Sequence, residues 1–263
     1  MAPKDSIIVI KIGGSTLENN GTILEDILLL QSKQYKPVVI HGGGKLINKW
    51  MERQGIFPRF VNGLRVTDKD AIDIVVSVLA GVINKRMVAE ISNAGGKAVG
   101  LCGIDGRIFE STIQNPLLGY VGKITKVNDQ LIHDILGAGY IPLIAPIGIN
   151  VTGDLEGSEF LNINADTAAG EIASALKAER LVFLTDVEGV LDVNNQLIEA
   201  LSLEQGRNLI ESGIAKQGMI PKLQSGLTAA ASGSDVSIIN GNTPQALLHS
   251  VDAKRIGTII KKR

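Results

Sequence analysis

Apolar, largely β-branched runs alternate along the chain with longer segments whose apolar positions follow a helical period. The runs are apolar without alternation, which is typical of strands buried on both faces of a parallel sheet. Strands are predicted at residues 7–11, 37–41, 98–102, 141–145, 181–185, 236–240 and 258–261. Strands separated by helices in this way predict an α/β chain with a doubly wound sheet.

Helical segments fill most of the intervals between these strands. Residues 67–70 (Thr-Asp-Lys-Asp) open a long helix over 67–92 with a start that is like a capping box, with Asp where Glu is usual. Thr243 and Pro244 are a predicted N-cap and first-turn proline for a helix over 245–250. Further helices are predicted over residues 22–34, 128–136, 165–178, 202–211 and 220–231.

Two stretches, residues 107–127 and 150–163, depart from this alternation. Both consist of short alternating pieces interrupted by glycines, which predicts hairpins laid over one end of the sheet as a substrate lid. No low-complexity linker divides the chain. We therefore expect a soft boundary near residues 176–179 between two lobes, 1–176 and 177–263.

Composition narrows the choice of ligand and compartment. The 26 basic and 27 acidic residues nearly cancel, which argues against a nucleic acid or an anionic membrane as partner. The single cysteine, Cys102, excludes an internal disulfide and fits a reducing compartment. No apolar run approaches the length of a membrane span. We expect a cytoplasmic protein with small-molecule ligands.

Two of the predicted strands end in consecutive glycines and lead into a helix. Gly13 and Gly14 follow the first strand, and residues 42–44 follow the second. Such glycines let the backbone approach an anion, while the amides of the next helix point at it. One glycine turn is more often only a topological necessity, but two of them favour phosphate binding. The P-loop, dinucleotide and G-x-S-x-G patterns are absent, which argues against those enzyme classes.

Two lysines accompany these turns. Lys11 lies between apolar residues immediately before the first glycine pair, so its ammonium would lie beside a bound anion. The alternative is a solvated residue at the end of a strand. Lys222 follows a turn and enters an Ala-rich helix, where a cation opposes the helix dipole unless a phosphate offsets it. An ordinary first-turn lysine is the alternative, and the sequence does not decide between them.

Further polar residues lie where predicted strands and helices meet. Asn162, Asn164 and Asp166 span a strand end and a helix start, and Asn164 or Asp166 could simply cap that helix. Arg65 precedes the long helix and could bind a carboxylate bidentately. A solvated arginine is the alternative.

Seven tracts in this order resemble the amino-acid kinase family, over about residues 7–260. They are residues 11–14, 41–44, 62–67, 120–122, 162–166, 185–190 and 218–222. The resemblance implies an open three-layer αβα sandwich around a mainly parallel sheet. It also implies that lobe 1–176 binds the amino acid and dimerises, and that lobe 177–263 binds ATP with magnesium. The implied activity is phosphorylation of the side-chain carboxylate of N-acetyl-L-glutamate, in arginine biosynthesis.

The resemblance also implies roles for single residues. Lys11 and Lys222 match the two lysines that neutralise the transferring phosphoryl group, and Asp166 matches the carboxylate that orients both ammonium groups. Magnesium is expected on the ATP phosphates, with little direct protein ligation. The expected ATP-binding residues are Asp186, Val187, Glu188, Gly189, Val190, Leu191, Ile214, Ala215 and Lys216.

The same resemblance implies different roles for the two glycine turns. The amides of Gly13, Gly14 and Gly43 are expected to hold the phosphoryl oxygens. Gly43 and Gly44 are expected to hold the reacting carboxylate of the acceptor. A carboxylate is already a nucleophile at neutral pH, so the chemistry requires no general base.

Arg65 and Asn162 match the residues that grip the α-carboxylate and the amide end of the acceptor. Residues 100–109 also look like related kinases that phosphorylate a carrier-protein-linked aminoadipate for lysine synthesis. The context of Arg65 favours acetylglutamate instead. A carrier-linked substrate would predict a basic docking rim, which the near-neutral composition does not support.

Regulation and catalytic competence can be addressed through the same family. Its arginine-inhibited members carry an extra N-terminal helix, whereas ten residues precede Lys11 here, so we expect an arginine-insensitive homodimer. A non-catalytic sensor on this fold would be expected to lack a catalytic lysine or the aspartate. Lys11, Asp166 and Lys222 are all present, which favours an enzyme.

Overall fold

The computed structural model describes residues 5–14, 16, 21–61, 63–152, 157–216, 218–252 and 256–261. The chain forms two compact units, one of Met1–Val39 with Ala169–Arg263 (the split unit) and one of Ile40–Ala168 (the continuous unit). This division differs from the single boundary expected near residue 176. The first strand belongs with the C-terminal part because β1 (Ile7–Ile12) pairs in parallel with β11 (Arg180–Thr185).

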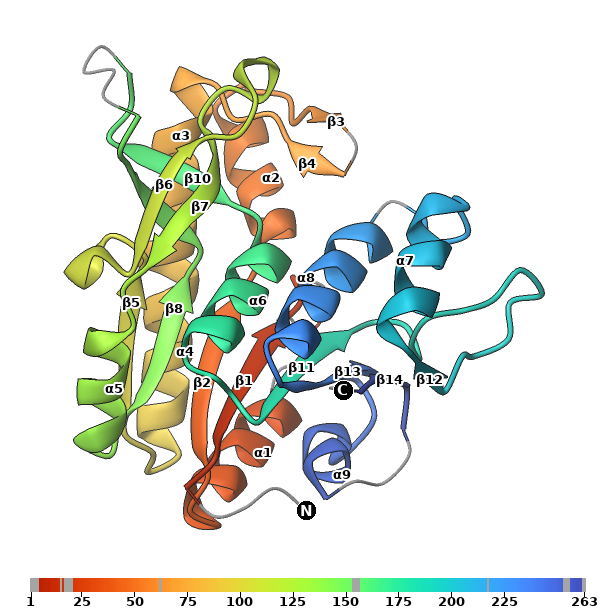
Figure 1. Ribbon diagram of the computed structural model, residues 1–263. Helices are drawn as coiled ribbons and strands as arrows, with labels where there is room; N and C mark the ends of the chain where they lie inside the picture. The colour runs from red at the N-terminus through yellow and green to blue at the C-terminus, as the bar shows by residue number, and fades with distance from the viewer. Residues whose placement is uncertain are drawn as a thin grey trace. The chain divides into compact units, whose positions relative to one another are not determined.

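Besides β1 and β11, the split unit contains α1 (Gly21–Ser32), β12 (Ala200–Leu201), α7 (Leu203–Glu211), α8 (Met219–Ala231), β13 (Asp235–Asn240), α9 (Ala246–Val251) and β14 (Thr258–Ile260). Its strands lie in the order β12-β14-β13-β11-β1, and every neighbouring pair is parallel except β13 with β14. Every residue of β11 is buried. The reason is that α8 packs on β11 and β13 from one face, whereas α9, beside α1, packs on the same strands from the other (Figure 1).

The N-terminus of α9 is capped by a side chain from another helix. The predicted N-cap at Thr243 is wrong, because the cap position is Gln245, in the left-handed region (φ 58°) and without a side-chain hydrogen bond. Asp26 of α1 instead accepts hydrogen bonds from the amides of Leu247 and Leu248. Burial raises the pKa of Asp26, and these two hydrogen bonds oppose the shift.

The continuous unit contains α2 (Gly44–Arg53), β3 (Phe60–Val61), β4 (Leu64–Arg65), α3 (Lys69–Val76), α4 (Asn84–Asn93), β5 (Ala98–Cys102), β6 (Phe109–Ile113), β7 (Val121–Val127), α5 (Gln130–Gly137), β8 (Ile141–Ala145), β9 (Ile147–Asn150) and β10 (Phe160–Ile163). Short 3₁₀ turns lie at Asp105–Arg107 and Pro116–Leu118. Strands β5 and β8 pair in parallel. Two elements cross the division between the units: β2 (Lys36–His41) and α6 (Ala165–Ala175).

The first stretch predicted as a lid hairpin (107–127) contributes β6 and β7 to a closed four-stranded barrel, and the second (150–163) contributes β10, whereas the fourth strand, β9, begins three residues before that stretch. The antiparallel pairs β6 with β7 and β9 with β10 are the hairpins, and the parallel pairs β6 with β9 and β7 with β10 close them on each other. The barrel lies beyond the carboxyl end of β8 (Figure 1). In the chain, only Pro146 separates β8 from β9. A Cβ on Gly122 would lie 2.7 Å from the Leu161 Cβ, so glycine allows the barrel to close tightly. Residues 153–156 of the second stretch lie outside the described residues.

The long helix predicted over residues 67–92 is interrupted. Asp68, one residue after the predicted start, is the N-cap of α3 and accepts a hydrogen bond from the Ala71 amide at 3.1 Å. A π-helix, η2 (Ser77–Ile83), then separates α3 from α4. A π-helix has a wider turn than an α-helix and therefore changes which side chains face a neighbouring element.

The predicted α/β class is confirmed, with a large, mainly parallel sheet and flanking helices. The apolar runs form its buried strands, since β1, β8, β11 and β13 are almost entirely inaccessible to solvent. Across the described ranges, none of the helices combines the length and the apolarity needed to cross a bilayer.

Candidate active site

The glycine turn after β2 opens directly into α2. Gly43 is the N-cap of this helix and Gly44 its first residue, and no side chain caps the helix. The first amides of a helix lack partners within the helix and attract anions. A Cβ on Gly43 would overlap the Ile83 side chain and lie 2.7 Å from Leu79 Cδ2, so η2 packs tightly against the turn. The predicted carboxylate site thus lies at a helix N-terminus that is held close to its neighbours.

Arg65 is buried beside α2, contrary to the solvated alternative. Its Nη2 donates to the Gly44 carbonyl at 3.2 Å and to Asn48 Oδ1, and its Nη1 lies 3.3 Å from the Met51 sulfur. Its Cζ is 4.8 Å from the ring centroid of Phe60, the residue that pairs with it across β3 and β4. Burial lowers the pKa of Arg65 to about 10, so it remains charged at neutral pH. All of these partners are neutral.

Thr67 links Arg65 to Asn162, another predicted acceptor-binding residue. Asn162 Nδ2 donates to Thr67 Oγ1 at 3.0 Å, and Thr67 Oγ1 donates to the Arg65 carbonyl at 3.4 Å. The backbone repeats the link, because the Thr67 carbonyl accepts from the Tyr120 amide and the Tyr120 carbonyl accepts from the Asn162 amide. Gly119 (φ 69°) makes this approach possible, since a Cβ there would overlap the Thr67 carbonyl. The structure therefore brings Arg65 and Asn162 into one hydrogen-bonded assembly.

The structure shows which of the two candidates, Asn164 or Asp166, caps the N-terminus of α6. Asn164 Oδ1 accepts hydrogen bonds from the amides of Asp166 (2.9 Å) and Thr167 (3.0 Å), so Asn164 is the cap. Asp166 lies in the first turn and is only 5% exposed. Negative charge at this end of a helix is favourable. Capping therefore explains Asn164, whereas Asp166 is a buried carboxylate that the cap does not require.

In the split unit, the carboxyl ends of the parallel strands β1, β11 and β13 meet at one edge. Lys11, opposite Phe183 in β11, is 5% exposed and is therefore not a solvated strand end. The Gly13 amide donates to the Leu184 carbonyl at 3.1 Å. That amide is thereby engaged in the sheet. Of the two phosphoryl donors predicted in this turn, Gly14 is the one we retain.

The predicted ATP segment begins where β11 ends. Its first part is exposed, and Glu188 there accepts a hydrogen bond from Asn240 at the end of β13 (2.7 Å). Its second part is anchored, because the Val190 amide donates to Thr258 Oγ1 at 2.8 Å. The predicted ATP residues that solvent reaches are Asp186, Val187, Glu188, Leu191, Ile214 and Lys216, and those that are buried are Gly189, Val190 and Ala215.

Ile214 also borders an open hollow of about 330 Å³ beside α7. Its wall is mainly apolar but carries two side-chain amides, a combination suited to a flat heteroaromatic ring. The other lining residues are Ile198, Leu201, Gln205, Asn208, Leu209 and Ser212. The sequence did not single these out, because apolar periodicity marks the core face of a helix and not the rim of a hollow.

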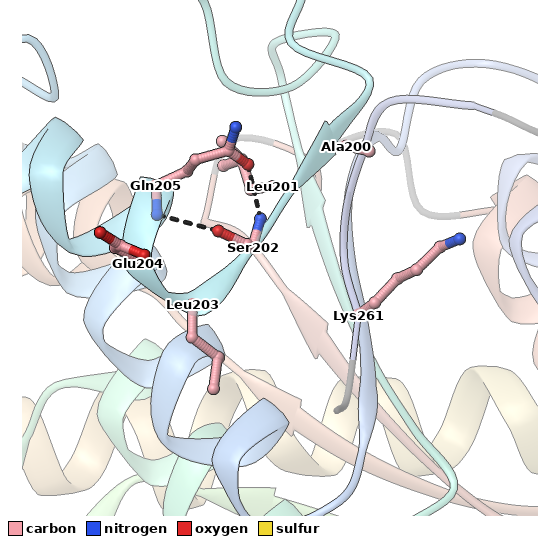
Figure 2. A pocket seen from close by; sticks show the side chains of 7 residues that line it. All are labelled: Ala200, Leu201, Ser202, Leu203, Glu204, Gln205 and Lys261. Carbon is pink, nitrogen blue, oxygen red and sulfur yellow. Dashed lines mark hydrogen bonds between the residues drawn. The ribbon is translucent and has the colours of Figure 1, made fainter.

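A second hollow, of about 420 Å³, borders the N-terminus of α7 (Figure 2). There Ser202 Oγ accepts from the Gln205 amide at 3.1 Å, and the Ser202 amide donates to Gln205 Oε1 at 2.9 Å. This capping box confirms the predicted helix start at residue 202 and satisfies amides that an anion would need. Glu204 adds negative charge beside it. We assign no ligand to this hollow.

Lys222 lies near the start of α8, as predicted. Its Nζ donates to the carbonyl of Gly218, the N-cap residue, at 3.1 Å. The ammonium therefore folds back toward the N-terminus of the helix, where it opposes the helix dipole. Gln217, immediately before, lies outside the described residues. Whether Lys222 binds a phosphate or is an ordinary first-turn lysine, its charge lies at the N-terminus of α8.

The profile of the amino acid kinase family matches residues 6–240. The chain belongs to this family. The acetylglutamate kinase of Dehalococcoides mccartyi strain BAV1 is 43% identical over 255 residues, covering 97% of this chain and 94% of the relative. That of Kosmotoga olearia is 45% identical over 260 residues, covering 96% and 90%. The solved structure of smu.665 from Streptococcus mutans UA159 has a TM-score of 0.83 at 32% identity and covers 98% of this chain and 99% of its own.

Several residues that contact Arg65 or Asn162 were not predicted as site residues. Asn48, Met51 and Phe60 surround Arg65, and Thr67 was predicted only as the start of a helix. Their contacts join segments far apart in the sequence, so no local pattern could reveal them. Asn62, in the tract that carries Arg65, lies outside the described residues.

His41, the last residue of β2, makes stability depend on pH. It is fully buried, and burial lowers its pKa to about 4, against about 6.5 in an unfolded chain. Between these values the unfolded chain binds a proton that the folded chain does not. We expect the free energy of unfolding to fall by about 3 kcal/mol as the pH decreases from 6.5 to 4, with no contribution above 6.5.

Denaturant unfolding across this pH range measures the effect. His41→Asn should remove this part of the pH dependence, whereas the same change at the exposed His133 should leave the wild-type slope. An unchanged slope in His41→Asn contradicts the assignment.

Proposed function

We propose that this chain is an acetylglutamate kinase, which transfers the γ-phosphoryl group of ATP to the side-chain carboxylate of N-acetyl-L-glutamate in arginine biosynthesis. The products are N-acetylglutamyl 5-phosphate and ADP. Its near full-length similarity to relatives of that name supports the proposal. One observation carries it at the site: Arg65 is a buried cation whose partners among the described residues are neutral. Burying a charge is costly without an opposite charge, so this position favours an anionic ligand.

The continuous unit would bind the acceptor. Arg65 takes the α-carboxylate, and Asn162, held to it through Thr67, takes the amide end. The amides of Gly43 and Gly44 take the reacting carboxylate at the N-terminus of α2. A carboxylate is ionised at neutral pH and attacks without a general base, so positioning is sufficient.

The split unit would bind ATP. Phosphoryl transfer has a loose transition state with charge on the equatorial oxygens, so fixed cations and amides are the useful groups. Lys11 and Lys222 supply the cations and Gly14 an amide, and Asp166 has the orienting role that the resemblance implies for it. The segment 186–191 and residues 214–216 contact the nucleotide, whose base occupies the hollow that Ile214 borders.

Magnesium would enter bound to the ATP phosphates. Among the described residues, no group of three or more His, Cys, Asp or Glu side chains is placed to hold a metal ion. We further propose a cytoplasmic enzyme, because the sole cysteine and the near-neutral composition fit that compartment.

Residues 100–109, which suggested an aminoadipate-type substrate, have a packing explanation. A Cβ on Gly100 would overlap Asn84, and a Cβ on Gly103 would overlap Phe109 and the Ile147 carbonyl. Gly100 therefore allows β5 to pass close to α4, and Gly103 allows the chain after β5 to pack against the first residues of β6 and β9. The segment does not need a role in substrate choice.

ADP formation with different acceptors tests the function. N-Acetyl-L-glutamate should support turnover. Glutamate should support far less because it lacks the amide that Asn162 takes, and N-acetyl-aminoadipate far less because its extra methylene lengthens the distance between the carboxylate at Arg65 and the one at Gly43 and Gly44. Preference for N-acetyl-aminoadipate would select the lysine-synthesis alternative. Nucleotide binding without turnover on any acceptor would select a sensor.

Lys11→Ala and Lys222→Ala separate catalysis from binding. Each variant should fold but lose turnover by on the order of a hundredfold or more, because each removes a cation from the transition state. The affinity for ATP should change far less. Lys33→Ala, at an exposed lysine on the same unit, serves as control. Near wild-type turnover of either variant in a coupled ADP assay refutes the assignment.

Arg65→Lys tests recognition of the α-carboxylate. The change keeps the charge but removes the planar fork, so KM for N-acetyl-L-glutamate should rise roughly tenfold or more with KM for ATP unchanged. Arg59→Lys, an exposed neighbour, should leave both constants as they are. A wild-type KM in Arg65→Lys would show that this guanidinium does not bind the acceptor.

We propose a homodimer that arginine does not inhibit, as the resemblance suggests. Light scattering should give twice the mass of one chain, and an arginine titration should leave turnover unchanged. A hexamer or inhibition by arginine contradicts this assembly.

A further inference from the structure

A buried hydrogen-bond network lies beneath the glycine turn of the continuous unit. Asn84, the first residue of α4, has no exposed surface, and its Nδ2 donates to the carbonyls of Leu143 (2.9 Å) and Leu101 (3.2 Å). The same nitrogen lies 3.1 Å from His41 Nε2, and Asn84 Oδ1 accepts from Lys85 Nζ at 3.1 Å. Carbonyl oxygens only accept hydrogen bonds and an ammonium only donates them. These partners therefore determine the orientation of the Asn84 amide.

The orientation of Asn84 in turn determines the tautomer of His41. The two N–H groups of Asn84 Nδ2 face three acceptors, and this amide nitrogen cannot itself accept a hydrogen bond. A proton on His41 Nε2 would therefore point at a donor, so Nε2 carries none. A neutral imidazole then has its proton on Nδ1, which lies 3.1 Å from the Gly42 carbonyl and donates to it. Burial and the nearby charge of Lys85 both lower the pKa of His41, which keeps the ring neutral.

The Gly42 carbonyl and the Gly43 amide belong to one planar peptide group. In a trans peptide these groups point in opposite directions, so a bond that holds the carbonyl also sets the direction of the amide. A hydrogen bond to the carbonyl further polarises the N–H group on the other side. Leu79 and Ile83 of η2 pack against Gly43. Leu79 and Ile83 of the π-helix therefore contact Gly43 directly, whereas Asn84, the residue after the π-helix, acts on Gly42 through His41.

We propose that His41 is a positioning residue, whose Nδ1–H orients the Gly42–Gly43 peptide so that the Gly43 amide donates to the reacting carboxylate. Asn84 fixes the imidazole that does this. The identity of the carboxylate rests on the proposed function. The orientation of the peptide by His41 does not, and it can be tested separately.

Two substitutions at the same position isolate the Nδ1 donor. His41→Asn places a side-chain amide where Nδ1 lies, so it can still donate to the Gly42 carbonyl. His41→Gln places its amide near the position of Nε2, so it can reach Asn84 but loses that donor. We expect His41→Gln to lower kcat/KM for N-acetyl-L-glutamate at least about tenfold, with KM for ATP within about twofold of wild type. His41→Asn should keep most of the activity.

The proposal is overturned if His41→Gln keeps wild-type kinetics, if both variants lose the same share of activity, or if His41→Gln weakens ATP and acceptor equally. A ¹⁵N NMR spectrum of the wild-type His41 ring decides the matter if the variants do not fold. The proton should be on Nδ1 at neutral pH, and a proton on Nε2 contradicts the proposal. A wild-type protein with this tautomer but without acetylglutamate turnover would refute the proposed function alone.

Discussion

A backbone amide selects an anion only where the surrounding structure prevents its peptide group from turning. The turn after β2 meets this condition on two sides. His41 holds the Gly42 carbonyl, and the side chains of Leu79 and Ile83 press against Gly43 from η2. The proposed acceptor site depends on this one peptide, since α2 starts there, Arg65 donates to the first residue of α2, and Thr67 donates to the Arg65 carbonyl.

The burial of positive charge at the site also favours an anionic ligand. Arg65 is buried at a strand end, where the charge of a bound anion would offset the cost of removing the cation from water. Arg65 is surrounded by oxygen, sulfur and an aromatic face, which hold the guanidinium in place without neutralising it. These neutral partners favour an anionic ligand, in agreement with the carboxylate that we propose for Arg65.

The sequence predicted the strands well, because a strand covered on both faces leaves an uninterrupted apolar run, as β11 does. It did not predict η2, since the apolar positions of residues 77–83 suit an α-helix equally well. It placed the cap of α9 at Thr243, whereas Asp26, distant in sequence, supplies the capping oxygen. Closure of the barrel likewise depends on pairing between two hairpins, which neither hairpin encodes alone.

The site residues, too, divide into those that the sequence could indicate and those that it could not. Gly43, Gly44 and Arg65 could be selected because each follows or precedes a recognisable element. The roles of Thr67 and Asn84 could not, because each acts through hydrogen bonds to segments far along the chain. The Gly13 amide was assigned to phosphate although it pairs with β11, a contact that only the register of the sheet shows.

The central claim is that fixed amides and buried cations direct phosphoryl transfer onto a carboxylate. Trapping with hydroxylamine tests it most directly, since an acyl phosphate reacts to give a hydroxamate and the unreacted carboxylate does not. With ATP, magnesium and N-acetyl-L-glutamate, we expect hydroxamate and ADP in equal amounts. ADP without hydroxamate, or neither product, would contradict it.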